Sequence, residues 1–492
     1  MELIKNKKKY ILKCDFSEKD IAKAAGFRWN PDDKVWWTDN KIKAEALSEY
    51  ADSKLKKHFK SIEKIIEESF KNDSKLDLKK PSGLEYYPFQ KAGIEFAMSK
   101  KNVLIADDMG LGKTIQAIGL LNQLDKFKTV LIVCPKTPML NWKEEIKKWL
   151  ILEVEIIICN SKSEIIDDGN IYIINYDILA KVKIPKIDIL IADEVHYAKN
   201  KKAVRSKSFY KIKSNRRIYL TGTPIMNRPA EIYSIAKSLD DKIFDTEYSF
   251  WNRYCDLQDN GYGLDYSGAS NIGELNRILR SSIMIRRLKK DVLTDLPEKT
   301  RQVIKFEGNQ RLIKKEMQLY QNSKKENIEI GNMGDIITLR KEIAIKKVPQ
   351  VLQYIKDTLE NEEKIIVFAH HKEVIKQLEE GLSSFEIVKI DGSVSQEDRQ
   401  KAIIKFQTGK ARIFVGSIRA CSEAITLTAA SHVIFAEIDW TPGKNIQAED
   451  RAYRIGQKNN VNITYLVYEK SVDEYILNTN IIKEEIINEI VN

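Results

Sequence analysis

Short, nearly continuous runs of Val, Ile and Leu recur along the chain and are separated by stretches with helical spacing. One set lies in residues 84–239 and includes NVLIADD, TVLIVCP, IDILIADE and RRIYLTG; another lies in residues 341–478 and includes KIIVFAH, ARIFVGS and NITYLVY. Apolar runs without alternation are typical of parallel strands buried on both faces, with the intervening helices as cover. The pattern predicts an α/β fold class with two doubly wound parallel-sheet domains.

The remaining segments differ from these two domains in pattern. Residues 1–55 predict a small α+β module, with a strand in KYILKCDF, a helix from a Ser17 cap to a Gly26 stop, and a strand in KVWWTD. We further expect a linker helix, a helical protrusion or connector with aromatic and basic clusters, and a C-terminal helix or tail, in residues 56–83, 240–340 and 479–492. A chain of 492 residues is too long for one hydrophobic core, which agrees with several domains.

The chain carries a formal net charge of +11. Clustered Lys and Arg release counterions from phosphates on binding, so this charge favours a polyanionic partner such as nucleic acid. An AT-rich coding genome, which inflates Lys, Ile and Asn, explains the same composition without any binding. Charge alone therefore leaves both interpretations open.

Cysteine spacing and hydropathy indicate in which cellular compartment the protein acts. No C-x-x-C pair occurs, so neither a zinc site nor a disulfide framework is predicted for the five cysteines, Cys14, Cys134, Cys159, Cys255 and Cys421. The N-terminus lacks the apolar stretch of a signal peptide, and no segment reaches membrane-spanning length. We expect an intracellular protein without a membrane partner, cytoplasmic or in the nucleoid if the source is a prokaryote or a virus.

A glycine-rich turn between a predicted strand and a predicted helix supplies the first candidate site. In IADDMGLGKT the backbone N–H groups can face phosphates, Lys113 can reach the β and γ oxygens, and Thr114 can ligate Mg²⁺. The usual first Gly of such a loop is Asp107 here. The alternative is a glycine-rich turn without a ligand. The sequence favours an ATP site with the binding residues Asp107, Met109, Gly110, Leu111, Gly112, Lys113 and Thr114.

A pair of acidic residues follows a later strand, in ILIADEVH. Asp193 can hold Mg²⁺ through water, and Glu194 can orient and deprotonate the attacking water. Taken alone, an Asp-Glu pair is more often a solvated turn, but after the glycine-rich loop it favours catalysis. His196 either couples nucleotide state to motion or is a satisfied core histidine, and both interpretations stay open.

A cation that arrives from another domain would make hydrolysis depend on closure of the two domains. The segment IQAEDRAYRIGQ offers Gln447, Arg451 and Arg454, and the two arginines share a face if the segment is helical. Such arginine fingers raise rates by about 10³ to 10⁵. The alternative is an ordinary basic helix face.

The ordered motifs across about residues 84–478 resemble the Swi/Snf group of superfamily-two helicase-related ATPases. They include YYPFQKAGIEFA, DDMGLGKT, INYDIL, DEVHYAKN, LTGTPIMNRP, KIDGSVSQEDR and QAEDRAYRIGQ. NRPAEIYS, RYCD, VFAHHK and FAEIDWTPG are similar to the annealing-helicase (HARP-type, fork-remodelling) branch. The resemblance implies two RecA-like lobes, ATP and Mg²⁺ as cofactors, and DNA-dependent hydrolysis that drives tracking along double-stranded or forked DNA without stable strand separation.

The same resemblance implies roles for particular residues. Gln90 would contact adenine, and Gln447 would also bind the nucleotide. Coupling between hydrolysis and motion would fall to His196, Thr221, Gly222 and Thr223. The residues near DNA would be Pro135, Lys136, Thr137, Asn175, Tyr176, His370, His371, Ser417 and Trp440. Two departures put coupling efficiency in doubt rather than ATP binding: Ala424 stands where the family usually has Gly, and Thr441 where it usually has Asn.

The N-terminal module resembles small accessory domains found beside primases and helicases, through EKDIAKAAGFRWNPDDKVWWTD. Its residues Arg28, Trp29, Trp36 and Trp37 could stack on unpaired bases or rest on a junction. The alternative is that these tryptophans form the core of a small domain, since large aromatic side chains stabilise such units.

The sequence also allows two alternatives to a DNA-translocating ATPase. An RNA helicase is the first, because DEVH resembles the DEAH box, although the RIGQ ending and the long connector argue against it. A non-hydrolysing nucleic-acid-binding scaffold is the second, and the intact Lys113, Glu194 and Arg454 argue against it. We expect the protein to be a monomer.

Overall fold

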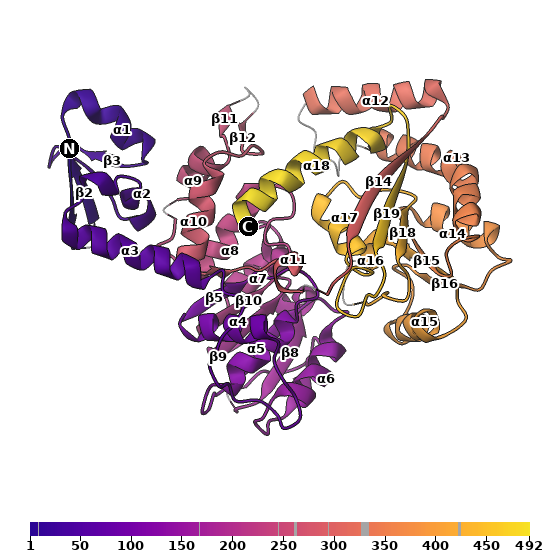
Figure 1. The fold of residues 1–492 in the computed structure, drawn as a ribbon, viewed down its shortest axis with the longest axis horizontal. Helices are drawn as coiled ribbons and strands as arrows, with labels where there is room; N and C mark the ends of the chain where they lie inside the picture. The colour runs from indigo at the N-terminus through magenta and orange to yellow at the C-terminus, as the bar shows by residue number, and fades with distance from the viewer. Residues whose placement is uncertain are drawn as a thin grey trace.

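The computed structural model describes residues 1–7, 9–166, 168–244, 246–259, 263–293, 295–325, 334–421 and 425–492. Within these residues, two parallel β-sheets flanked by helices are joined to a smaller antiparallel sheet at the N-terminus (Figure 1). The expected α/β class with two RecA-like parallel-sheet lobes is confirmed. No helix among the described residues has the length and apolarity needed to span a membrane.

The N-terminal module is a four-stranded antiparallel sheet in the order β1-β2-β4-β3, backed by helices on one face. Leu3, Leu12 and Trp36 are buried on the covered face together with Phe59 of the third helix. Its elements are β1 (Glu2–Asn6), β2 (Lys9–Lys13), α1 (Lys19–Ala24), β3 (Arg28–Asn30), β4 (Val35–Thr38), α2 (Lys41–Glu45) and α3 (Ser53–Glu68).

The sequence interpretation of this module was incomplete at three points. β1 and β3 were not predicted. Ser17 is not a helix cap, because it lies inside a 3₁₀ turn (Phe16–Glu18) for which Asp15 forms the capping box. The linker helix α3 ends at Glu68, and residues 69–87 contain only turns and irregular chain.

Lobe 1 contains a parallel sheet with the strand order β13-β5-β10-β9-β6-β8-β7. All residues of β6 and β8 are buried, because helices cover both faces, and this explains the apolar runs without alternation. The strands are β5 (Asn102–Ile105), β6 (Val130–Cys134), β7 (Ile156–Ile158), β8 (Ile171–Asn175), β9 (Ile187–Asp193), β10 (Ser214–Leu220) and β13 (Met284–Ile285). The helices are α4 (Pro88–Met98), α5 (Lys113–Asn122), α6 (Met139–Trp149), α7 (Val204–Tyr210) and α8 (Ile232–Leu239).

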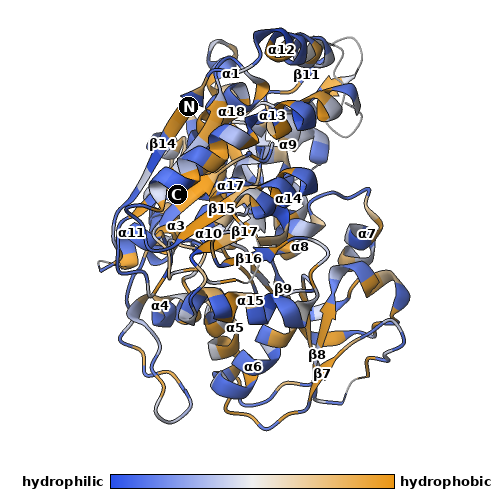
Figure 2. Cartoon of the chain, turned by 90° about the vertical axis from the view of Figure 1, so that its right-hand side faces the viewer, coloured by the Kyte–Doolittle hydropathy of each residue, from blue (hydrophilic) through white to orange (hydrophobic). Residues whose placement is uncertain are grey.

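Lobe 2 contains a parallel sheet with the order β14-β19-β18-β15-β17-β16. Figure 2 shows hydrophobic colour concentrated on strands, while the helices carry both colours, as expected for helices that cover a sheet. The strands are β14 (Lys299–Phe306), β15 (Ile365–Ala369), β16 (Ile387–Ile390), β17 (Ile413–Ser417), β18 (His432–Phe435) and β19 (Val461–Tyr468). The helices are α13 (Gly334–Thr358), α14 (Lys372–Gly381), α15 (Gln396–Thr408), α16 (Ile418–Cys421), α17 (Pro442–Glu449) and α18 (Val472–Val491).

The segment expected to be a helical connector also contributes strands to both sheets. β13 pairs with β5 at the edge of the lobe 1 sheet, and β14 pairs with β19 at the edge of the lobe 2 sheet. Neither strand was predicted, because β13 has only two residues and β14 is a largely exposed edge strand without an apolar run. The other elements here are α9 (Glu247–Tyr254), β11 (Gln258–Asp259), β12 (Leu264–Asp265), α10 (Ile272–Ser282), α11 (Lys289–Val292) and α12 (Gln310–Lys325).

The C-terminal helix α18 connects the two lobes. It begins beside the lobe 2 sheet and runs back toward lobe 1 (Figure 1). At its end Ile490 and Val491 are buried with Leu275 of α10, and the Asn276 side chain donates a hydrogen bond to the Ile490 carbonyl at 2.8 Å. The expected boundary between lobe 2 and a C-terminal tail at residue 478 therefore falls inside one continuous helix.

Candidate nucleotide-binding site between the lobes

The glycine-rich loop lies between β5 and α5, where the sequence pattern placed it. Gly110 and Gly112 have φ values of 84° and 69°, a left-handed conformation that favours glycine. A Cβ atom on Gly112 would lie 2.4 Å from Nε2 of Gln90, so this position also lacks space for a side chain. Lys113 donates hydrogen bonds to the carbonyl oxygens of Asp107 (2.8 Å) and Asp108 (3.1 Å), and burial lowers its pKa.

The Asp107 side chain is turned into lobe 1 and does not line the cavity between the lobes, so a contact of Asp107 with the nucleotide stays a prediction. Its Oδ1 accepts hydrogen bonds from the backbone N and Nε of Arg287, both at 2.9 Å, and the Arg287 guanidinium also pairs with Oδ2. Gln116 donates to Oδ2 at 2.8 Å. The ion pair is almost fully buried, with side-chain exposures of 1% and 0%. Asp107 therefore replaces the usual glycine for a structural reason.

The two predicted catalytic acids lie at the end of β9. Glu194 has a φ of 48°, an uncommon left-handed conformation for a residue other than glycine. Its Oε2 accepts a hydrogen bond from Thr221 and lies near Nδ1 of His196, both at 3.1 Å. Burial and the neighbouring charge of Glu194 raise the pKa of Asp193. Burial opposes ionisation of Glu194 as well, but the contacts with His196 and Lys113 lower its pKa, so Glu194 is the stronger acid of the pair.

Trp142 is a site residue that sequence reasoning missed. Its indole Nε1 donates a hydrogen bond to Oδ2 of Asp193 at 2.8 Å, and its side chain is fully buried. A tryptophan on the apolar face of α6 gives no sequence signal for such a role, because the same pattern serves core packing.

The lobe 2 residues Arg451 and Arg454 approach the loop from the opposite side. An Arg451 guanidinium nitrogen lies 3.6 Å from the sulfur of Met109, and a Cβ atom on Gly110 would lie 3.2 Å from Cβ of Arg454. Burial, with the neighbouring Arg451, lowers the pKa of Arg454 to about 10. The arginines do not share a helix face as expected, because α17 ends at Glu449 and both lie in the turns that follow.

One cavity of about 160 Å³ brings the predicted catalytic residues together. Its lining includes Gly110, Gly112, Lys113, Thr114, Trp142, Asp193, Glu194, Arg451 and Arg454. Thr114 and Asp193 offer the oxygen ligands that Mg²⁺ prefers. No cluster of three or more His, Cys, Asp or Glu side chains suited to a metal occurs in the described part of the chain. Thr114 and Asp193 therefore fit a magnesium ion that is also bound by nucleotide phosphates.

The expected coupling residues form a continuous hydrogen-bonded path between the lobes. Thr221 donates to Glu194 at 3.1 Å, and the backbone N of Thr223 donates to Oγ1 of Thr221 at 3.1 Å. Gln447 of lobe 2 then donates to Oγ1 of Thr223, also at 3.1 Å. His196 is buried and contacts both Thr221 and Glu194, so it is a satisfied histidine that also touches the predicted catalytic acid.

Two further expected residues lie beside this path. A Cβ atom on Gly222 would lie 2.4 Å from the side chain of Met109, which explains the need for glycine. Gln90 is buried, and its amide donates to the Leu111 carbonyl at 3.3 Å. Its contact with adenine stays a prediction.

The lobe 1 residues expected near DNA divide into two groups. Lys136 is exposed and Thr137 half-buried, directly after β6, whereas Pro135 is buried. Tyr176 is 2% exposed and donates a hydrogen bond to the Asp193 carbonyl at 2.9 Å. Asn175 is also buried, and its side chain caps the turn that follows β8. Both side chains are enclosed: Tyr176 contacts the end of β9, whereas Asn175 accepts a hydrogen bond from the backbone N of Asp177. A contact of either residue with DNA stays a prediction.

The lobe 2 residues expected near DNA lie mostly at the carboxyl ends of strands. The backbone N–H groups of His370 and His371 donate to Glu437 at 2.8 and 2.9 Å, and Nδ1 of His371 lies 2.6 Å from the same carboxylate. Ser417 ends β17 and is half-buried. Trp440 packs against Arg340, whose guanidinium carbon lies 4.5 Å from the ring centre.

The two departures from the family pattern also lie in lobe 2. Thr441 precedes the first residue of α17, and its side chain makes no capping hydrogen bond. Ala424 lies outside the described residues.

Comparison with known proteins defines the class to which this two-lobed arrangement belongs. The SNF2-related domain matches residues 34–366, and the helicase conserved C-terminal domain matches residues 346–456. A domain of unknown function (DUF5710) matches residues 9–52. The chain belongs to the SNF2 family of helicase-related proteins, which confirms the expected kinship.

Two kinds of curated relative are similar to most of the chain. A SWI/SNF-related matrix-associated actin-dependent regulator of chromatin subfamily A-like protein 1 from Xenopus tropicalis is 38% identical over 427 residues, which is 82% of this chain and 44% of the relative. The human DNA annealing helicase and endonuclease ZRANB3 is 38% identical over 415 residues, 78% of this chain and 38% of the relative. The chain thus spans less than half the length of these relatives.

A solved structure is also similar to the chain. The Sulfolobus solfataricus SWI2/SNF2 ATPase core in complex with dsDNA is 22% identical, with a TM-score of 0.42, and the match covers 86% of this chain and 99% of that one.

Proposed function

We propose that the chain is a DNA-dependent ATPase that hydrolyses ATP, with Mg²⁺, between its two lobes and uses the cycle to translocate along double-stranded DNA. The observation that carries this proposal is the shared cavity, which Lys113 and Glu194 line from lobe 1 and Arg451 and Arg454 line from lobe 2. Neither lobe alone offers both the acids and the arginines, so hydrolysis depends on the approach of the lobes. Because one chain supplies both halves, it can act as a monomer.

Each residue of the cavity has a defined task in this mechanism. Lys113 exchanges its hydrogen bonds with loop carbonyls for the phosphate oxygens of ATP, and the loop N–H groups face the same oxygens. Glu194, held ionised by His196 and Lys113, orients and deprotonates the attacking water. Arg451 and Arg454 neutralise charge on the phosphates. When bound to Thr114 and Asp193, Mg²⁺ supplies further charge neutralisation.

Hydrolysis is communicated to lobe 2 through the path from Glu194 to Gln447. Loss of the γ phosphate changes the surroundings of Glu194, and the hydrogen bonds of Thr221 and Thr223 transmit that change to Gln447. Lys136 in lobe 1 and Ser417 in lobe 2 contact DNA phosphates, so movement is independent of sequence and sensitive to salt.

DNA is favoured over RNA as the substrate, because relatives at 38% identity include a protein named a DNA annealing helicase. The N-terminal module adds a preference for forked DNA. On the uncovered face of its sheet, Trp37 lies between Lys9, 4.1 Å from the ring centre, and Arg28, at 5.1 Å. An aromatic ring flanked by cations suits an unpaired base and its phosphate.

ATP hydrolysis measured with duplex, single-stranded and forked DNA and with RNA tests the proposal. We expect duplex DNA to stimulate turnover, forked DNA to stimulate it more at low concentration, and RNA to have little effect. Stimulation by RNA would support an RNA helicase. Nucleic-acid binding without stimulated turnover would support a scaffold.

A further inference from the structure

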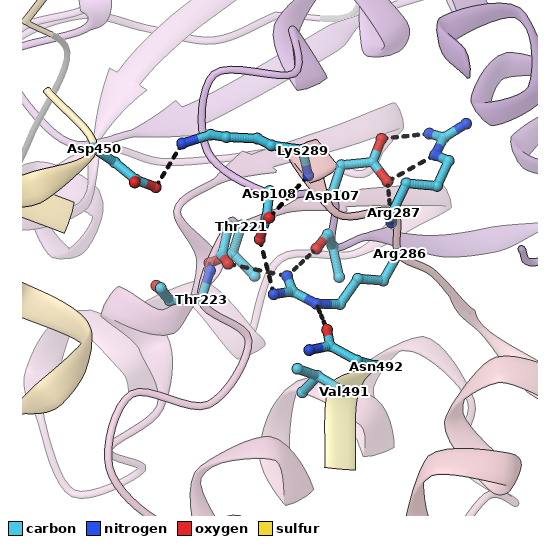
Figure 3. Close-up of polar contacts among 12 residues, drawn as sticks. Asp107, Asp108, Thr221, Thr223, Arg286, Arg287, Lys289, Asp450, Val491 and Asn492 are labelled. Carbon is cyan, nitrogen blue, oxygen red and sulfur yellow. Dashed lines mark hydrogen bonds and ion pairs between the residues drawn. The ribbon is translucent and has the colours of Figure 1, made fainter. Parts of the chain in front are cut away.

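The chain passes from the lobe 1 sheet to the lobe 2 sheet between β13 and β14, and Lys289 lies at the start of this crossing. Its backbone N donates a hydrogen bond to Oδ2 of Asp108, next to the glycine-rich loop, at 3.1 Å. Its side-chain Nζ lies 2.9 Å from Oδ2 of Asp450 and donates to the Tyr453 carbonyl at 2.6 Å. One residue thus contacts both the loop of lobe 1 and the arginine-bearing turn of lobe 2 (Figure 3).

The contacts of Lys289 with Asp108 and Asp450 form a bridge between the lobes. At the Asp108 end, this bridge is reinforced by Arg286. Arg286 donates to Oδ1 of Asp108 at 2.9 Å, while Lys289 occupies Oδ2 of the same carboxylate. Arg286 also donates to the carbonyl oxygens of Ala106 (2.6 Å) and Gly222 (3.1 Å). The crossing segment is therefore bound to the phosphate-binding loop and to the coupling path at once.

The lobe 2 side of the bridge is adjacent to the arginines. Asp450 directly precedes Arg451 in the chain and lies at the end of α17. Lys299 on β14 lies 3.7 Å from the other Asp450 oxygen, so Asp450 keeps a cation of its own lobe if Lys289 is removed. A shift of Asp450 moves Arg451 and, through the following turn, Arg454.

The ion pair is poorly suited to a purely stabilising role. The Lys289 and Asp450 side chains are 4% and 6% exposed, and burial lowers the pKa of Lys289 to about 8 despite the nearby carboxylate. Buried ion pairs of this kind add little net stability over apolar side chains of similar size. A cavity of about 360 Å³ beside them, lined by Asp108 and Gly222 from lobe 1 and Ile446 from lobe 2, leaves the interface incompletely packed.

We propose that Lys289 is a positioning residue that ties the arginine-bearing turn of lobe 2 to the phosphate-binding loop of lobe 1 through Asp450. The inference deepens the proposed function and rests on it. Nucleotide-dependent movement of the loop reaches Asp108, then Lys289, then Asp450, so the position of the two arginines in the cavity depends on the position of the loop. This route does not pass through Thr221, Thr223 or Gln447, although Arg286 links the crossing segment to Gly222 between the two threonines.

Replacement of Lys289 by methionine tests the inference, because methionine keeps the length of the stem and removes the charge. We expect Lys289→Met to lower the DNA-stimulated kcat about 10²-fold, the size of effect produced by small misplacements of catalytic groups. The KM for ATP, the Kd for duplex DNA and the Tm should stay near wild-type values. Lys290→Met is the matched control, since Lys290 is the exposed neighbour, and it should leave kcat unchanged.

A double variant checks that the effect passes through Asp450. Asp450→Asn should lower kcat in the same way, and Lys289→Met combined with Asp450→Asn should be no slower than the worse single variant. A kcat for Lys289→Met equal to that of Lys290→Met overturns the inference, as does a loss of kcat matched by a loss of folded protein. If the wild-type chain itself shows no DNA-stimulated turnover, the proposed function fails and the inference fails with it.

Discussion

The indole Nε1 of Trp142 donates a hydrogen bond to Oδ2 of Asp193 at 2.8 Å, while Oδ1 of the same carboxylate accepts one from the backbone N of Glu194 at 3.0 Å. Both oxygens of the proposed magnesium-binding acid are therefore oriented by fixed donors. Tyr176 adds a third contact through the Asp193 carbonyl. Such supporting contacts determine how well a ligand group presents itself to a metal ion.

Trp142→Phe should weaken the apparent affinity for Mg²⁺ by about 10- to 100-fold, because the ring remains and only the N–H donor is lost. A Mg²⁺ titration of DNA-stimulated ATP hydrolysis measures this. Trp149→Phe is the matched control, since Nε1 of Trp149 has no hydrogen-bond partner among the described residues. Equal Mg²⁺ dependence of the two variants would show that Trp142 does not support Mg²⁺ binding through Asp193.

Lys113→Ala should abolish DNA-stimulated hydrolysis, with a loss of at least about 10²-fold in kcat, because no other group in the loop can neutralise the phosphates. Binding to duplex DNA should survive. Lys136→Ala should behave oppositely, with weaker duplex binding, a salt slope smaller by about 1 and unchanged ATP affinity. Turnover and filter binding at several salt concentrations separate the two variants, and near-wild-type turnover in Lys113→Ala would contradict the assignment.

Asp107→Asn should lower the free energy of unfolding by about 3 to 5 kcal/mol, because it leaves the buried Arg287 guanidinium without a counter-charge. Asp107→Leu combined with Arg287→Met should recover much of this loss. Asp125→Asn is the control, since the Asp125 side chain is 94% exposed in its pair with Lys79. Denaturant unfolding provides the measurement, and equal stability of Asp107→Asn and Asp125→Asn would be inconsistent with a structural Asp107.

Acidification should lower the free energy of unfolding because Glu449 becomes protonated. Burial opposes ionisation of this fully buried carboxyl, but Lys299 and Arg301 lower its pKa from 4.5 to about 2. The folded state therefore gains roughly 3 kcal/mol above about pH 4.5, and this gain is lost as the pH falls toward 2. In urea unfolding at pH 3 to 7, Glu449→Gln should be less stable near pH 7 and should lose less stability on acidification. If wild type and Glu449→Gln lost the same stability between pH 7 and pH 3, Glu449 would not be the source of the acid sensitivity.

Substitutions on the two faces of the N-terminal sheet should have different effects, one on folding and the other on DNA binding. Trp36 is 9% exposed and packs under the helices, so Trp36→Ala should destabilise the module by about 3 to 5 kcal/mol. Trp37 lies on the opposite face, so Trp37→Ala should keep the Tm and weaken binding to forks by about 1 to 3 kcal/mol, with duplex binding unchanged. Fluorescence anisotropy with forked and plain duplexes measures this, and equal fork affinity would leave the face without a DNA role.

The sequence by itself determined the two parallel-sheet lobes, the loop around Lys113, the acids at the end of β9 and the arginine-bearing segment. The lobes are marked by recurring apolar runs, whereas the loop, the acids and the arginine-bearing segment are each encoded within about ten neighbouring residues, so periodicity and spacing are enough to find them. Only the tertiary structure decided what lies around them. The partners Trp142 and Asp193 are separated by 51 residues, and Asp107 and Arg287 by 180. Strand register and helix packing bring such residues together, and these depend on the whole fold rather than on local pattern. For the same reason the burial of Tyr176, the entry of β13 and β14 into the sheets, and the bridge from Lys289 to Asp450 could not be derived from the sequence.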